Sequence, residues 1–86
     1  MKIELDCERL KARASAHAYM AEMLGFPEYY GKNLDALYDC LTEKSGLSVV
    51  LKGAAELAAA GGYGARILQV IREAAAENPG LSVEFL

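Results

Sequence analysis

Three short segments of the chain carry apolar residues in the pattern of β-strands. Residues 2–6 and 81–86 alternate polar and apolar side chains. Residues 47–51 form a short apolar run, which is typical of a strand covered on both faces, as in parallel sheets. The pattern therefore predicts three strands, at the beginning, the middle and the end of the chain.

Between these strands, apolar residues recur at helical spacing. In the first helical segment, Leu10, Ala14 and Ala18 share the apolar face with residues 20–24. Residues that end or break helices follow the segments, and they include Gly25, Gly61-Gly62 and Asn78-Pro79-Gly80. Helices are expected over about residues 8–24, 34–44, 54–60 and 63–77.

The order of these segments predicts a fold. Strands separated by helices imply parallel pairing with right-handed crossovers. We therefore expect an α/β protein with a small three-stranded parallel sheet packed with about four helices. Residues 1–86 are expected to form a single domain, since the chain contains no repeat, linker or low-complexity segment.

The most informative run extends from Phe26 to Thr42 and joins an aromatic-rich turn to a short helix. Pro27 cannot continue the preceding helix. Asn33 is a suitable N-cap, because its side chain can accept a hydrogen bond from a free backbone amide. The following apolar residues have helical spacing and form a buried stripe: Leu34, Leu37, Tyr38 and Leu41.

Two aspartates occupy the other side of this helix. Asp35 and Asp39 are four positions apart and therefore share one face. Of the two adjacent tyrosines, Tyr30 is expected to support the turn and Tyr29 to point outward as an interface anchor. The surface fits a concave, positively charged pocket on another macromolecule, although acid pairs on helices are more commonly ordinary solvated faces.

Composition narrows the possible functions. The 86 residues have a net charge of -3 and are 53% hydrophobic, which argues against direct nucleic-acid binding. No apolar stretch is long enough to span a bilayer, and the N-terminus lacks the apolar core of a signal peptide. We therefore expect a cytoplasmic protein without membrane contact, in which Cys7 and Cys40 are free thiols.

An enzyme is the less favoured interpretation. Cys40 and His17 could suggest thiol catalysis, but Cys40 follows Asp39, which opposes ionisation, and His17 has no evident partner in the sequence. Cys7, His17 and Cys40 also lack the paired spacing of a zinc site. No catalytic residue, metal or other cofactor is expected.

Two separate motifs resemble the barstar family of intracellular inhibitors of guanyl-specific ribonucleases. The first motif is Pro27-Glu28-Tyr29-Tyr30-Gly31, then Asn33-Leu34-Asp35-Ala36-Leu37, then Asp39-Cys40-Leu41-Thr42; the second is Leu68-Gln69-Val70 with Arg72-Glu73-Ala74. The resemblance implies that the turn and second helix enter the active site of a barnase-like or toxin-type ribonuclease, in an immunity or antitoxin role.

The resemblance also implies roles for individual residues. Tyr29 matches a tyrosine that packs against the enzyme's catalytic histidine. Asp39 matches the acid that replaces the substrate phosphate, and Asp35 matches an acid at the guanine or phosphate site. Glu73 matches an acid of the last helix that forms a peripheral ion pair. With the neighbouring positions, the predicted partner-binding residues are Tyr29, Tyr30, Gly31, Asn33, Asp35, Tyr38, Asp39, Thr42, Glu43 and Glu73.

The chain departs from the family's pattern at three positions. Tyr38 and Lys44 stand where the family usually has tryptophan, and Lys32 stands where a carboxylate is common. Two hypotheses follow: an inhibitor of a barnase-type ribonuclease, or a binding module of the same fold for a different basic partner or toxin. The free protein is expected to be a monomer.

Overall fold

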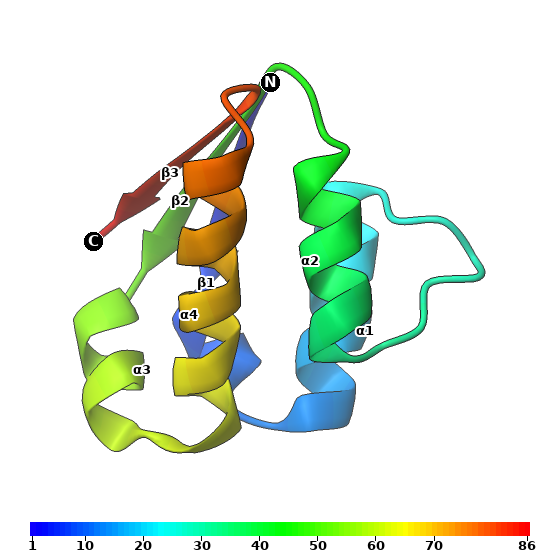
Figure 1. Ribbon diagram of the computed structural model, residues 1–86. Coiled ribbons are helices and arrows are strands. Elements are labelled where there is room, and N and C mark those ends of the chain that lie inside the picture. Colours follow the sequence, from blue (N-terminus) through cyan, green and yellow to red (C-terminus); the bar gives the residue numbers. More distant parts are fainter.

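The computed structural model describes all residues from Met1 to Leu86. Its sheet has three parallel strands in the order β1 (Lys2–Asp6), β2 (Leu47–Lys52) and β3 (Leu81–Phe85), as Figure 1 shows. The predicted α/β fold with a three-stranded parallel sheet is therefore confirmed. Each strand also ends within one residue of its predicted bounds.

Four α-helices accompany the sheet: α1 (Arg13–Leu24), α2 (Leu34–Thr42), α3 (Ala54–Ala60) and α4 (Gly62–Glu77). Helices α2 and α4 pack side by side, and α3 packs against α4 near the carboxyl end of β2 (Figure 1). Gly64 permits this close packing of α4. A Cβ atom there would overlap the side chain of Leu57 and lie 3.0 Å from the carbonyl oxygen of Leu10.

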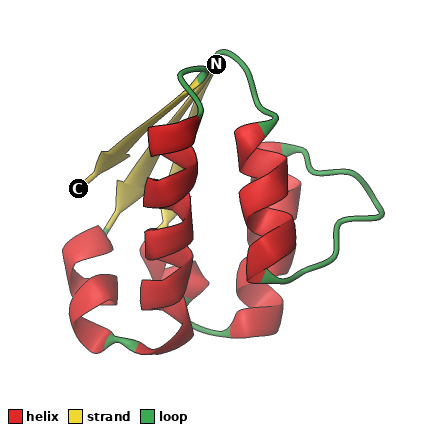
Figure 2. Cartoon of the chain, viewed as in Figure 1, coloured by secondary structure: helices red, strands yellow, loops and turns green.

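Helices cover only one face of the sheet (Figure 2). The apolar side chains of the strands alternate toward that face and join the core, among them Leu5, Val49 and Leu51. Polar side chains stand in register on the opposite face: Lys2, Glu4, Asp6, Ser48, Lys52, Ser82 and Glu84. Val50 is the one apolar residue there; its side chain is buried, but it lies outside the core cluster. Because no helix covers this face, the prediction that β2 is covered on both faces, as in a parallel sheet with two helical layers, is wrong.

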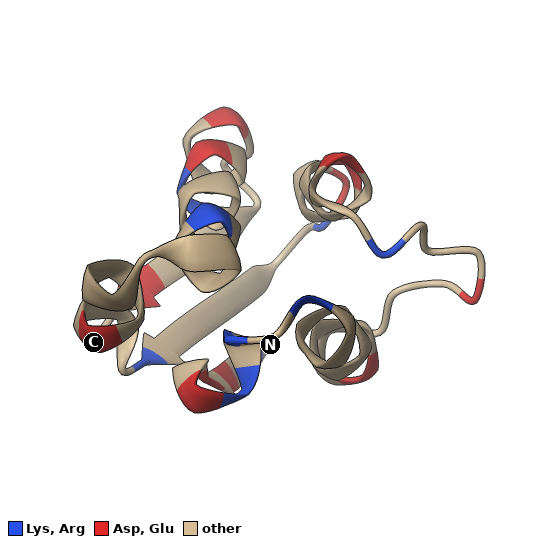
Figure 3. Ribbon diagram, turned by 90° about the horizontal axis from the view of Figure 1, so that it is seen from below, with Lys and Arg blue, Asp and Glu red and all other residues tan.

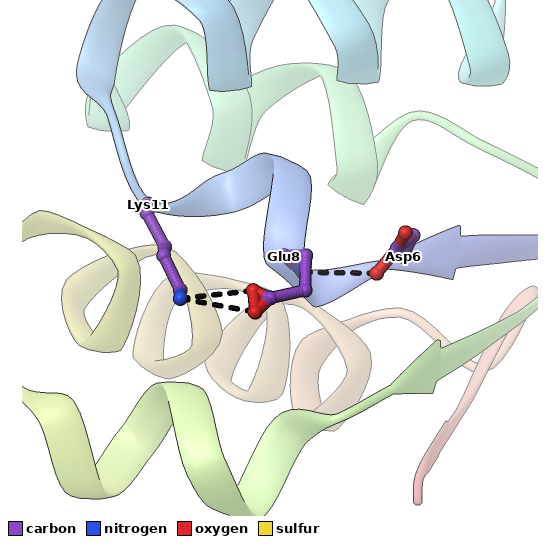
Figure 4. A network of polar contacts seen from close by, with 3 residues as sticks. All are labelled: Asp6, Glu8 and Lys11. Carbon is purple, nitrogen blue, oxygen red and sulfur yellow. Dashed lines mark hydrogen bonds and ion pairs between the residues drawn. The ribbon is translucent and has the colours of Figure 1, made fainter.

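The predicted first helix over residues 8–24 is divided into two pieces. A 3₁₀ helix, η1 (Cys7–Leu10), follows β1 directly, and α1 begins only at Arg13. The carboxylate of Asp6 accepts a hydrogen bond from the Glu8 backbone amide at 3.0 Å, and Lys11 pairs with Glu8 at 2.8 Å (Figure 4). These local contacts hold η1 in place before the chain turns.

The break between η1 and α1 also changes which residues face inward. Ala12 has extended backbone angles, and no glycine or proline marks the break in the sequence. Ala14 and Ala18 are exposed, contrary to the prediction. The buried face of α1 consists of Ala16, His17, Tyr19, Met20 and Leu24.

Side-chain hydrogen bonds join α2 and α4 at their carboxyl ends. Asn78, which follows α4, donates from Nδ2 to the carbonyl oxygens of Leu41 at 2.9 Å and Lys44 at 2.7 Å. Its Oδ1 accepts a bond from the Gly80 amide at 2.9 Å. Asn78 thus ends α4, as predicted, and also supplies side-chain donors to carbonyls at the carboxyl end of α2.

Candidate functional site

The loop of residues 25–33 stands out from the body of the protein beside α2 (Figure 1). Gly25 leaves α1 in the left-handed conformation, with φ of 68°. Within the loop, the Phe26 amide donates to the Ala21 carbonyl and the Tyr30 amide donates to the Pro27 carbonyl, each at 3.0 Å. Because backbone bonds are few here, side-chain contacts determine how the loop sits on the body.

Tyr29 is exposed and Tyr30 is buried, as predicted. The Tyr29 side chain is 89% exposed, whereas Tyr30 is 6% exposed. The Tyr30 ring packs against Phe26 with 4.8 Å between ring centroids. Burial is the main cause that raises the pKa of the Tyr30 hydroxyl above its usual value, so Tyr30 supports the loop as a neutral phenol and Tyr29 is presented to solvent.

His17 has two hydrogen-bond partners, which corrects the prediction that it has none. It is fully buried on α1. Its Nδ1 lies 2.6 Å from the hydroxyl of Tyr30, and its Nε2 lies 2.6 Å from the hydroxyl of Tyr63. Burial and, secondarily, the charge of Arg13 lower the pKa of His17. Tyr63 is 46 positions away along the chain, so no local pattern indicates this contact.

The start of α2 is held by its predicted N-cap. The side chain of Asn33 accepts a hydrogen bond from the Ala36 amide at 2.7 Å and donates to the Gly31 carbonyl at 3.3 Å. A Cβ atom on Gly31 would lie 3.3 Å from both Ala36 Cβ and Asn33 Nδ2, so the turn leaves little space for a side chain. Lys32, beside it, has a left-handed φ of 54°.

Helix α2 presents unpaired acids to solvent. Leu37 and Leu41 are buried against the core, while Asp35 and Asp39 are exposed. The protein contains two ion pairs, Lys11–Glu8 and Lys52–Glu4, and neither involves α2 or loop 25–33. Figure 3 marks the positions of acidic residues along α2 and α4. The carboxylates of α2 are therefore available to an external cation.

A hollow of about 540 Å³ lies between loop 25–33 and α2. Five of the predicted binding residues line it: Tyr29, Tyr30, Gly31, Asp39 and Glu43. Phe26, Cys40 and Lys44 also line it, and the Lys44 ammonium lies 5.6 Å from the centroid of the Phe26 ring. The structure thus brings the exposed tyrosine, two acids and a lysine around one concave surface.

The remaining predicted residues lie around this hollow rather than in it. Asn33 and Asp35 line a second, smaller hollow of about 250 Å³ with Arg13, Tyr63 and Arg66. The Tyr38 side chain is half-buried against the core. The remaining two residues hydrogen-bond within their own helices: the Thr42 hydroxyl donates to the Asp39 carbonyl at 3.0 Å, and Glu73 accepts from Gln69 at 2.9 Å.

The two cysteines carry protonated thiols. Burial raises the pKa of Cys7 to about 11, and burial together with the charge of Glu43 raises the pKa of Cys40. Both ring nitrogens of His17 are engaged by tyrosines, so His17 does not activate Cys40. No group of three or more His, Cys, Asp or Glu side chains is arranged to hold a metal ion. No helix is both long and apolar enough to cross a bilayer.

Comparison with known sequences decides the family. The family described as Barstar (barnase inhibitor) matches residues 1–85. This chain belongs to the barstar family. A relative named "Putative ribonuclease inhibitor YrdF", from Bacillus subtilis (strain 168), is 39% identical over 79 residues, which are 88% of this chain and 87% of the relative. The resemblance inferred from two motifs therefore extends over nearly the whole sequence.

In this barstar-family protein, the two motifs meet in space. The first motif forms loop 25–33 and α2, and the second lies in α4, which packs beside α2. The sequence patterns did not indicate that His17 and Tyr63 support the loop from the protein interior. They also did not indicate Arg13 and Arg66, which lie beside the start of α2. Only a long-range contact pattern could have indicated them.

Proposed function

We propose that this protein is an intracellular inhibitor that blocks the active site of a barnase-type, guanyl-specific ribonuclease. The observation that carries the proposal is the face formed by α2 and loop 25–33, where Asp35 and Asp39 have no internal ion-pair partner beside the exposed Tyr29. Membership of the barstar family and the name of the Bacillus subtilis relative support ribonuclease inhibition. They favour an inhibitor over an enzyme.

The proposed mechanism follows from the chemistry of ribonucleases. An enzyme that holds a phosphodiester needs a concave, cationic site. A carboxylate on a rigid helix can occupy the phosphate position and accept charge-assisted hydrogen bonds from arginine and histidine. In this proposal Asp39 takes that position, and Asp35 engages the neighbouring guanine or phosphate region. Inhibition is steric and reversible, since no bond of the inhibitor is cleaved.

The other residues of the face have supporting roles in the proposal. Tyr29 packs against the catalytic histidine of the enzyme, and its rigid ring supplies contact area at little entropic cost. Gly31, Asn33 and Thr42 line the contact, and Glu43 adds negative charge at the hollow. Three further residues support the contact at its edge or from the protein interior: Tyr30, Tyr38 and Glu73.

The test is a titration of a barnase-type ribonuclease with this protein. We expect stoichiometric loss of activity for the wild type. Asp39→Ala should weaken inhibition by about 2 kcal/mol or more, or about thirtyfold, because it removes the acceptor of charge-assisted bonds.

The matched control is Glu84→Ala, which removes the same charge from the exposed face of the sheet and should inhibit like the wild type. Equal inhibition by Asp39→Ala and the wild type would contradict the proposed mechanism.

A second candidate function is a binding module for a different basic partner or toxin. It is favoured by Lys44, which lines the hollow, and by Lys32, which lies between Gly31 and the α2 N-cap. From Glu28 to Lys44, four acids are opposed by these two lysines. A partner that binds this face has to accommodate its two lysines as well as its acidic residues. In both candidates the free protein is a cytoplasmic monomer.

A further inference from the structure

The buried cluster of His17, Tyr30 and Tyr63 links three parts of the molecule. His17 belongs to α1, Tyr30 to loop 25–33 and Tyr63 to the start of α4. The ring centroids of both tyrosines lie 5.6 Å from that of His17. Tyr63 is partly exposed, whereas His17 and Tyr30 are buried. The hydroxyl of Tyr63 therefore lies at the boundary between the cluster and solvent.

Counting protons determines how the cluster is hydrogen-bonded. A neutral imidazole has one N–H donor and one nitrogen acceptor. His17 is the only hydrogen-bond partner of the buried Tyr30 hydroxyl, so the Tyr30 proton is satisfied only if it is donated to Nδ1. The His17 proton then resides on Nε2 and is donated to the oxygen of Tyr63. The Tyr63 proton is not used within the cluster, and Tyr63 is partly exposed to solvent.

This arrangement links Tyr30 to Tyr63 through the imidazole of His17. In the opposite tautomer, Nδ1 donates to Tyr30 and the buried Tyr30 proton loses its acceptor, which is costly. Tyr30 is also the residue that connects Tyr29 and Gly31, and both of these line the large hollow. With few backbone bonds in loop 25–33, the hydrogen bond from Tyr30 to His17 is a principal anchor of this segment.

We propose that Tyr63 is a positioning residue for partner binding: by accepting the Nε2 proton of His17, it satisfies the imidazole tautomer that holds Tyr30 and thereby helps to orient Tyr29 and Gly31. The proposal rests on the proposed function, because it assigns a role in the same binding face. Tyr63 itself is placed outside the large hollow and acts through His17. Its hydroxyl is the only part of the side chain that the role requires.

The decisive variant is Tyr63→Phe, which removes the hydroxyl and retains the ring that packs beside Arg13 and Arg66. The matched control is Tyr19→Phe. The Tyr19 hydroxyl accepts a hydrogen bond from the Asp6 amide at 2.9 Å, at the end of β1 and not in loop 25–33. Both variants lose one tyrosine hydroxyl from a hydrogen bond within the fold.

Three readouts test the role. Long-range ¹⁵N NMR of the free wild-type protein should show His17 protonated at Nε2, and Tyr63→Phe should change this pattern. Hydrogen exchange of the backbone amides of residues 29–31 should become about three- to tenfold faster in Tyr63→Phe, as expected for loss of one hydrogen bond. Inhibition of a barnase-type ribonuclease should weaken by a similar factor. Tyr19→Phe should change none of the three.

Unchanged imidazole signals and unchanged exchange at residues 29–31 in Tyr63→Phe would overturn the proposal. Equal effects of Tyr19→Phe would also overturn it, because they would indicate general loss of stability. If the wild type does not inhibit the ribonuclease, the proposed function fails. The NMR and exchange measurements on the free protein then still decide whether Tyr63 positions the loop.

Discussion

At the scale of single residues, neighbouring side chains of the same type serve different purposes. Tyr30 is buried with its hydroxyl bonded to His17, whereas Tyr29 places a large aromatic ring in water. An exposed tyrosine contributes little to folding. The same ring becomes valuable when a partner covers it, because its area is buried with few side-chain torsions to restrict.

Replacement of Tyr29 should therefore separate binding from stability. We expect Tyr29→Ala to change the free energy of unfolding by less than about 0.5 kcal/mol and to weaken inhibition by about 2 kcal/mol. Urea denaturation and inhibition assays measure the two quantities. Tyr29→Phe, which retains the ring, should inhibit nearly as well as the wild type. A large loss of stability in Tyr29→Ala would show that the ring supports the fold.

His17 should make the stability of the protein depend on pH. Burial lowers its pKa in the folded state below the usual value of 6.5. As pH falls below 6.5, the unfolded chain takes up a proton that the folded protein does not, so the free energy of unfolding decreases. The decrease is at most about 1.4 kcal/mol per pH unit and ends at the folded-state pKa. In contrast, stability above 6.5 should not depend on this group.

Denaturation of His17→Gln between pH 5 and 7 tests this prediction. The variant lacks the titrating imidazole, so its stability should vary less with pH over this range than that of the wild type. Parallel pH profiles for the two proteins would show that His17 does not contribute. The difference between the two pH profiles does not contain the contribution of carboxylates, which titrate at lower pH and are present in both proteins.

At the scale of elements, the position of α2 depends on contacts at both of its ends. Asn33 caps its start, and Asn78 supplies donors to carbonyls at its carboxyl end. Between the ends, Leu37 and Leu41 are buried against the core. Because α4 packs beside α2 and is joined to it through Asn78, the acids of α2 and the exposed Glu73 of α4 lie on neighbouring helices.

Removal of the Asn78 side chain should loosen this surface. Asn78→Ala leaves the carbonyls of Leu41 and Lys44 without their side-chain donor, and we expect a loss of about 1–3 kcal/mol in the free energy of unfolding. Urea denaturation measures the loss. Ser82→Ala, at an exposed position on the sheet, should change stability by less than about 0.5 kcal/mol. A similarly small change in Asn78→Ala would exclude a structural role for this contact.

At the scale of the whole molecule, charge is distributed unevenly over a weakly acidic protein. The net charge is -3, and the acids of α2 are unpaired. The polar face of the sheet carries charges of both signs, including the Lys52–Glu4 pair. A cationic partner should therefore be attracted to the α2 face more than to the sheet.

The rate of association with a cationic ribonuclease should depend on salt. We expect the association rate constant to fall by about tenfold or more from low to high ionic strength, with a smaller change in the dissociation rate constant.

Lys32→Glu should increase the association rate at low salt, since it replaces a cation beside the acids. A decrease in this variant would indicate that the partner presents an anionic group to Lys32 and would favour the second candidate function. Stopped-flow or surface-based kinetics measure both effects.

The sequence by itself determined the strands, the start of α2 and its acidic face, while α2 ends at Thr42, two residues before its expected end. Alternation, helical spacing, the Asn33 cap and the spacing of Asp35 and Asp39 are local properties that neighbouring residues impose. Together with the family resemblance, these local properties predicted that Tyr29 is exposed and Tyr30 is buried. The binding roles of these residues remain predictions.

Only the tertiary structure decided how these parts are held. The break before α1, the uncovered face of the sheet and the exposure of Ala14 and Ala18 depend on packing between distant elements. The contact between His17 and Tyr63 spans 46 positions, and Asn78 reaches Leu41 over 37. Burial makes such polar contacts obligatory, because an unpaired buried group is costly. The partner of each group, however, is chosen by the fold and not by its neighbours in the chain.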